Sequence, residues 1–318
     1  MIKKDRFTKY FKLIVFFIFL VFFLISPLGR ITLEIFFKKS SLIEFISLFA
    51  FTLSLSLGFN FIAMSGKINL SLASSILIGQ LFFTIFAIRI SNPILVFLLA
   101  GALSIPVSFL VSYFSNYLDL KLSIDTVVSS LITNYIALYL VSFINFSLLR
   151  DKSSTAMASR IFMTKNTFPL GIILSLILFT LYIYIYKNTS YGENLLISGE
   201  NRKMASLLGF KPRILDKKAV FLASLFAALS AGVFLLENYN NLEVRDPSIF
   251  WDATLISITS RQKPIQTLIF SFIFTLVKLS FSILSRRGNL SYELVVILET
   301  IFIFGLLIFR NRGEVKYE

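Results

Sequence analysis

Two apolar stretches flank a short basic one in the middle of the chain. Residues 169–187 read PLGIILSLILFTLYIYIYK, residues 218–236 read KAVFLASLFAALSAGVFLL, and residues 192–213 between them read GENLLISGENRKMASLLGFKPR. A helix needs about 20 mainly apolar residues to cross the roughly 30 Å hydrocarbon core of a bilayer. The apolar stretches therefore predict membrane spans, and the basic stretch predicts an exposed loop between them.

The composition extends this prediction to the whole chain. Hydrophobic residues make up 56% of the 318 residues and charged residues only 15%, whereas about 25% is usual in soluble domains. The apolar runs are continuous rather than alternating, which excludes a transmembrane β-barrel. We therefore expect an all-α polytopic membrane protein.

About ten membrane segments fit this pattern. The nine clear ones are 11–28, 43–58, 68–90, 94–114, 126–149, 169–187, 218–236, 264–284 and 293–309. The tenth, 247–260, is short. The first run begins among five basic residues between Lys3 and Lys12 but lacks a small-residue cleavage site, so it is expected to be an uncleaved span rather than a signal peptide. One transmembrane domain, 11–309, is expected between an N-terminus at 1–10 and a tail at 310–318.

The positions of the basic residues predict the orientation. Lysine and arginine collect in cytoplasmic loops, and they crowd the loop 188–217 and the tail after 309. We therefore expect this loop and both termini to be cytoplasmic. That arrangement needs an even number of crossings, so 247–260 must cross the membrane. If it is a re-entrant hairpin instead, the tail lies outside.

Polar interruptions occur at matching places in the two halves of the chain. Residues 58–71 and 237–263 are polar, and long apolar runs follow each of them. Paired broken segments are typical of transporters with internal repeats, and irregular backbone at membrane depth must face protein or water. The pattern predicts a two-fold pseudo-repeat with a solute pathway; ordinary loops are the alternative.

Several polar residues lie within predicted spans. Lys278 and Glu299 fall at similar depths in consecutive antiparallel spans, so we expect an intramembrane ion pair; alternatively, Lys278 extends to the membrane surface. Asp252 follows the only tryptophan and either lines a pathway or lies at the interface. Asn134 binds either a solute or another helix.

Absent residue types exclude several kinds of chemistry. The chain has no cysteine and no histidine, no GxxxxGK[ST] phosphate-binding loop and no HExxH motif. We expect no metal site, no cofactor and no enzymatic activity in this chain alone. The net charge of +14 fits cytoplasmic loops better than nucleic-acid binding.

The basic stretch has the signals of a short capped helix. Asn201 is a suitable N-cap, and Gly209 suits the left-handed position after the last turn, with Pro212 beyond it. Asn201, Ala205 and Gly209 are four residues apart, which predicts a face of small residues beside Met204 and Leu208. Such a helix serves either as a docking element or as a linker at lipid headgroups.

Three motifs resemble those of permease subunits of binding-protein-dependent ABC importers. They are GKINLSL at 66–72, LDLKLSIDTVVSSLITNYIALYL at 118–140 and SGENRKMASLLGF at 198–210. The group is that of simple sugars and nucleosides, related to the ribose and branched-chain amino acid permeases. Ile124-Asp125 replaces its usual Asn-Glu pair, and Ser206 replaces the second alanine of its usual pair.

This resemblance implies a function and partners. The loop 192–213 would couple the permease to separate ATP-binding cassette subunits in the cytoplasmic membrane of a bacterium. Substrate would arrive from an extracytoplasmic binding protein or lipoprotein and pass through a dimer of identical or related permeases. The implied coupling residues are Gly199, Asn201, Arg202, Met204, Ala205, Leu208 and Gly209. The implied pathway residues are Asn60, Asn69, Asn134 and Asp252.

Two alternatives to an ABC permease for nucleosides or simple sugars remain open from the sequence. One is a secondary transporter coupled to H⁺ or Na⁺ through Asp252 or the Lys278–Glu299 pair. The other is an integral membrane enzyme, which is disfavoured because no catalytic constellation is present.

Overall fold

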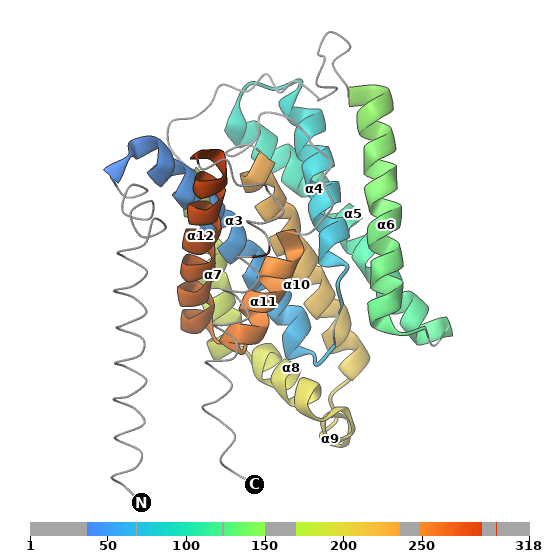
Figure 1. Cartoon of the computed structure of the whole chain (residues 1–318). Coiled ribbons are helices and arrows are strands. Elements are labelled where there is room, and N and C mark those ends of the chain that lie inside the picture. Colours follow the sequence, from blue (N-terminus) through green and yellow to red (C-terminus); the bar gives the residue numbers. More distant parts are fainter. Residues whose placement is uncertain are drawn as a thin grey trace, which may run out of the picture. The chain divides into compact units, whose positions relative to one another are not determined.

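The computed structural model describes residues 37–67, 69–122, 124–149, 170–235, 249–287 and 297, and the elements within them are all helical (Figure 1). The main helices are α3 (Lys39–Met64), α4 (Leu72–Ala87), α5 (Pro93–Leu122), α6 (Thr126–Ile144), α7 (Leu170–Asn188), α10 (Pro212–Val233), α11 (Ile249–Ser260) and α12 (Pro264–Arg287). A π-helical turn (η1, Asn145–Leu149) extends α6, and two short helices, α8 (Ser190–Glu200) and α9 (Arg202–Leu207), precede α10.

The chain divides into two compact units. The larger unit is residues 46–272. The smaller unit includes the described residues 37–45 and 273–287, where Arg286 Nη2 pairs with Glu44 Oε1 at 2.6 Å and where Val277 and Phe281 are buried together. The fold and the candidate site discussed below belong to the larger unit.

Five described helices are long and apolar enough to cross a membrane. They are Lys39–Met64, Pro93–Asp119, Thr126–Leu149, Gly171–Asn188 and Pro264–Arg286. They confirm the prediction of a helical multi-pass membrane protein. The number of ten segments and the orientation of the termini stay predictions, because segment 11–28 and all of 293–309 except residue 297 lie outside the described residues.

The first polar interruption is shorter than the sequence suggests. The helix α3 continues to Met64, so the break begins at Ser65 and not at Gly58 as predicted. A Cβ atom on Gly58 would lie 2.9 Å from Phe226 Cβ and 3.1 Å from Ala223 O of α10. Gly58 therefore permits close packing of two helices and does not end one. The helix after this break, α4, has 16 residues and is shorter than the predicted span 68–90.

Small residues also bring α10 close to α4. The buried face of α10 consists mainly of alanines, including Ala227, Ala228 and Ala231. A Cβ atom on Gly79 of α4 would lie 2.7 Å from Ala231 Cβ. Small side chains let membrane helices approach closely and gain dispersion energy over a long contact. The helix α10 packs against both α4 and α5.

The helices α8 and α9 lie at one end of the larger unit (Figure 1). The turn between α11 and α12 lies there too, because Tyr182 Oη, near the end of α7, donates to Gln262 O at 2.6 Å. The helix α11 has 12 residues, or about 18 Å at 1.5 Å per residue. It is a short segment as predicted, and whether it crosses the membrane stays a prediction.

Candidate functional site

The helix α9 has the bounds that its sequence predicts. Asn201 is its N-cap, and the Asn201 side chain accepts a hydrogen bond from Met204 N at 3.0 Å. At the other end, Phe210 N donates to Ala205 O and Gly209 N donates to Ser206 O, while Gly209 has φ +84°. This pair of bonds is the Schellman motif, in which glycine takes the left-handed conformation without a Cβ penalty. Both predicted caps are confirmed.

The helix α8 was not predicted, although its first turn carries a signal. Thr189 caps it by accepting a hydrogen bond from Gly192 N at 3.3 Å, and Glu193 lies in the first turn. A threonine followed by an acidic first turn is typical of a helix start. Leu195 and Ser198 are buried, so α8 packs against other helices of the larger unit, and α9 follows at its end.

Part of the outer surface of α9 is apolar, next to the exposed Lys203 and Ser206. Leu207 is 83% exposed, Met204 52% and Leu208 53%, and these three positions share one helical face. Ala205 is fully buried within the chain. The predicted small-residue face therefore serves, at Ala205, to seat α9 on the protein itself. Met204, Leu207 and Leu208 form an exposed apolar face that another molecule could contact.

The end of α8 touches the turn after α3 through two glycine backbones. A Cβ atom on Gly66, which has φ +70°, would lie 2.5 Å from Gly199 O. A Cβ atom on Gly199 would overlap Met64 O and lie 3.0 Å from Gly66 N. Because the neighbouring atoms are backbone, no side-chain movement relieves these contacts. The two glycines therefore hold the α8–α9 segment directly against the α3–α4 break.

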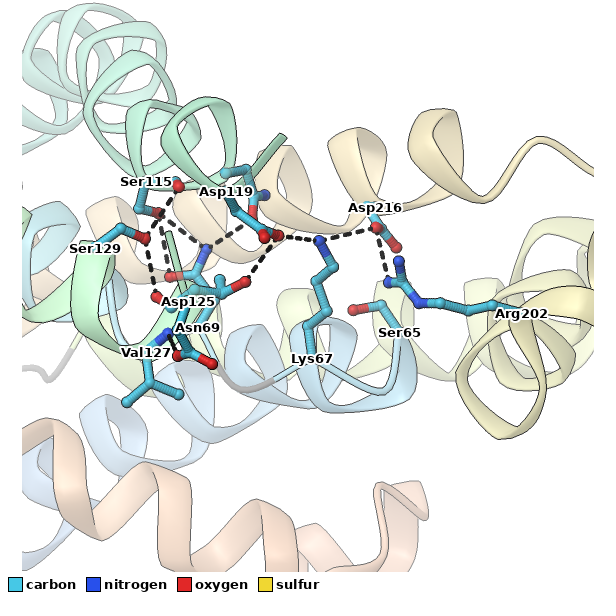
Figure 2. A network of polar contacts seen from close by, with 12 residues as sticks. Ser65, Lys67, Asn69, Ser115, Asp119, Asp125, Val127, Ser129, Arg202 and Asp216 are labelled. Atoms are coloured by element: carbon cyan, nitrogen blue, oxygen red, sulfur yellow. Dashed lines mark hydrogen bonds and ion pairs between the residues drawn. The ribbon is translucent and has the colours of Figure 1, made fainter. Parts of the chain in front are cut away.

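A row of ion pairs joins the same segments beside this contact (Figure 2). Lys67 Nζ lies 2.6 Å from Asp119 Oδ2, at the end of α5, and 3.7 Å from Asp216 Oδ2, in the first turns of α10. Arg202 Nη2, at the start of α9, lies 2.9 Å from Asp216 Oδ2. Thr126 Oγ1, at the start of α6, donates to Asp119 Oδ2 at 2.9 Å. We call Lys67, Asp119, Asp216 and Arg202 the ion-pair quartet.

Tyr191 of α8 packs near the quartet. Its hydroxyl donates to Leu215 O at 3.3 Å. Burial, with the nearby charge of Asp216, raises the pKa of Tyr191. The phenol therefore stays protonated across the physiological range and remains a hydrogen-bond donor to α10.

Two predicted pathway residues, Asn69 and Asn134, form hydrogen bonds around the start of α4. Asn134 Nδ2 of α6 donates to Leu70 O at 2.8 Å, and Asn134 Oδ1 accepts from Ser74 N at 3.0 Å. Asn69 Oδ1 accepts from Ser71 N at 2.8 Å, while Asn69 Nδ2 donates to Ser115 Oγ at 3.1 Å. The N-cap residue Ser71 makes no side-chain cap bond. The two asparagines thus satisfy backbone groups that a helix start leaves free.

The other predicted residues lie apart from this point. Asn60 is buried in α3, and its Nδ2 donates to Thr267 Oγ1 of α12 at 2.9 Å. Asp252 lies half-buried in α11. Lys278 lies in α12, but Glu299 is outside the described residues, so their pairing stays a prediction. Within the described part of the chain, no three His, Cys, Asp or Glu side chains form a metal-binding group.

Comparison with known proteins identifies the family. Residues 41–309 match the family described as the permease component of the branched-chain amino acid transport system. The chain belongs to this family of ABC-transporter permeases. It is therefore a multi-pass membrane transport subunit, and its family works with ATPase and substrate-binding partners.

A solved structure supports the fold of this ABC permease. The chain is similar to a chain of PsaBC from Streptococcus pneumoniae in complex with Fab, with a TM-score of 0.51 and 15% sequence identity. The likeness covers 85% of the permease and 90% of that chain, and it concerns the fold alone. No curated protein matches the sequence.

Proposed function

We propose that the chain is the permease subunit of an ABC importer that carries a small polar solute, a nucleoside or a simple sugar. Separate ATPase subunits dock on the loop 192–213, with α9 as the contact. The observation that carries this proposal is the exposed apolar face of α9, where Leu207 is 83% exposed. Family membership supplies the context, because such permeases work with ATPase partners.

The way in which α9 is held supports a docking role. A helix of six residues is unstable alone, because nucleation costs more than so few hydrogen bonds return. Here Asn201 caps one end, Gly209 terminates the other and Ala205 is buried; such a cap contributes about 1 kcal/mol. A helix held in this way can pass a movement of the ATPase to the permease, whereas a flexible linker at the headgroups cannot.

The sequence motif at 118–140 supports the proposed solute class, and family membership supports a substrate-binding partner. The motif at 118–140 resembles that of nucleoside permeases, and the structure places its Asn134 at the buried start of α4. A second permease subunit, identical or related, and an extracytoplasmic binding protein complete the proposed importer in a bacterial cytoplasmic membrane. The ATPase subunits would supply the energy, so this chain would need no catalytic residue.

Thiol labelling of position 207 tests the docking site. The chain has no cysteine, so Leu207→Cys introduces a single thiol. We expect a water-soluble maleimide to modify this thiol much more slowly in the complete transporter than after the ATPase is stripped off. The reason is that a docked ATPase covers the side chain.

A control position and two contrary results show how the labelling experiment tests docking on α9. Leu122→Cys, an exposed position beyond the candidate span Pro93–Asp119, should react equally before and after stripping. Equal labelling of position 207 in both states would contradict docking on α9. Protection in both states would instead place Leu207 in the lipid headgroups.

A further inference from the structure

A continuous row of polar contacts runs from α6 to α9 through Lys67. Its members, in order, are Thr126, Asp119, Lys67, Asp216 and Arg202, and Figure 2 shows the Lys67 side chain between the two carboxylates. These residues come from five elements of the fold, namely α6, α5, the turn between α3 and α4, α10 and α9. Lys67 is the one residue of the row that contacts both carboxylates.

Charge and burial make this row a specific link. The quartet contains two acids and two bases, so its charges balance. Asp216 and Lys67 are largely shielded from solvent, whereas Arg202 is more exposed. Partly buried ion pairs are screened less than exposed ones, and a buried carboxylate that loses its partner is strongly disfavoured. Without Lys67, Asp119 and Asp216 would be two acids with no base between them.

The two ion pairs of Lys67 differ in length. Asp119 Oδ2 accepts from Lys67 at 2.6 Å and from Thr126 at 2.9 Å, which ties Lys67 to the turn between α5 and α6. Asp216 Oδ2 lies 3.7 Å from Lys67 but 2.9 Å from Arg202. Lys67 therefore pairs closely with the end of α5, whereas its connection to α9 runs through the longer contact with Asp216.

The glycine contact fixes the backbone next to this lysine. Gly66 touches Gly199 through backbone atoms, so the end of α8 and the turn that carries Lys67 are in direct contact. A displacement of α8 therefore moves the residue before Lys67. The quartet is the connection from that turn to α5 and α6.

We propose that Lys67 is a positioning residue for coupling, which carries a displacement of α9 to the α5–α6 turn through Asp216 and Asp119. This inference rests on the proposed docking of an ATPase on α9. Loss of Lys67 should leave the ATPase bound and α9 responsive, but α5 and α6 should no longer follow.

Distance measurements between spin labels in the complete transporter test this role. The absence of cysteine allows labels at Ser206→Cys on α9 and Leu122→Cys at the end of α5, each paired with Tyr184→Cys on α7. ATP with vanadate is the probe that closes the ATPase subunits. In the parent chain, we expect both distances to shift.

Substitution of Lys67 should separate the two shifts. With Lys67→Met, the shift at 206 should persist and the shift at 122 should be lost. Lys67→Arg should restore the shift at 122, because it keeps the charge and the reach. Lys187→Met, at an exposed lysine outside the quartet, should behave as the parent. If Lys67→Met does not fold, Asp119→Ala breaks the same link from the other side and should give the same pattern.

The possible outcomes distinguish the two proposals. A full shift at 122 in folded Lys67→Met, or in Asp119→Ala, would overturn the role of Lys67 while leaving the docking intact. No shift at 206 in the parent chain, with the ATPase present and ATP bound, would contradict the docking proposal itself.

Discussion

Replacing Gly199 with alanine is expected to lower the free energy of unfolding by about 3 kcal/mol, the upper part of the range for overpacking a tight contact. The added Cβ would overlap Met64 O and lie 3.0 Å from Gly66 N. Because both atoms belong to the backbone, α8 must move away from the α3–α4 break. Thermal unfolding of the purified protein in detergent measures the loss.

Gly101→Ala is the matched control for this change. Gly101 lies within α5, and an added Cβ would meet only the flexible Leu229 Cδ2, at 3.3 Å. Alanine also favours the helix by about 1 kcal/mol relative to glycine. We expect this variant to unfold close to the parent temperature. Equal effects of the two substitutions would show that the backbone contact between Gly66 and Gly199 does not hold α8.

Replacing Asn134 with leucine is expected to destabilise the protein by about 2–3 kcal/mol, the cost of leaving a buried polar group unpaired. Leucine has a similar size but cannot accept from Ser74 N or donate to Leu70 O. Ser71 offers no side-chain cap in compensation. Unfolding temperature and protease resistance of the α4 region measure the effect.

Thr133→Val, at the neighbouring buried position, is the control for Asn134→Leu. Thr133 Oγ1 donates to Ser129 O of its own helix, and loss of such a bond costs little because helical backbone groups already have partners. Equal stability of Asn134→Leu and the parent would contradict the capping role of Asn134. Normal stability with altered solute affinity would instead support the predicted place of Asn134 on the solute pathway.

Local signals in the sequence predicted local structure well. The ends of α9 depend on Asn201 and Gly209, whose hydrogen bonds are made within a few residues, so sequence spacing suffices to locate them. The apolar run 126–149 coincides with α6 and its π-helical extension. These predictions succeeded because caps and apolar length act without tertiary contacts.

Features that depend on tertiary packing escaped prediction. Gly58 was interpreted as the start of a break, but it allows α10 to approach α3. Ala205 was expected on a free face, but it is buried. Lys67, Asp119 and Asp216 are far apart in sequence, and no pattern along the chain brings them together. A glycine, an alanine or a charge does not by itself show what lies opposite it.

Co-purification of the ATPase with a Leu207→Arg permease tests the central claim most directly. An arginine on the exposed apolar face of α9 places a charge where the proposed docking surface is apolar, without touching the buried Ala205. The matched control is Leu122→Arg, an exposed leucine at the end of α5. Docking on α9 predicts that Leu207→Arg folds but loses the ATPase, while Leu122→Arg retains it. Retention of the ATPase by folded Leu207→Arg at the parent level would contradict the account.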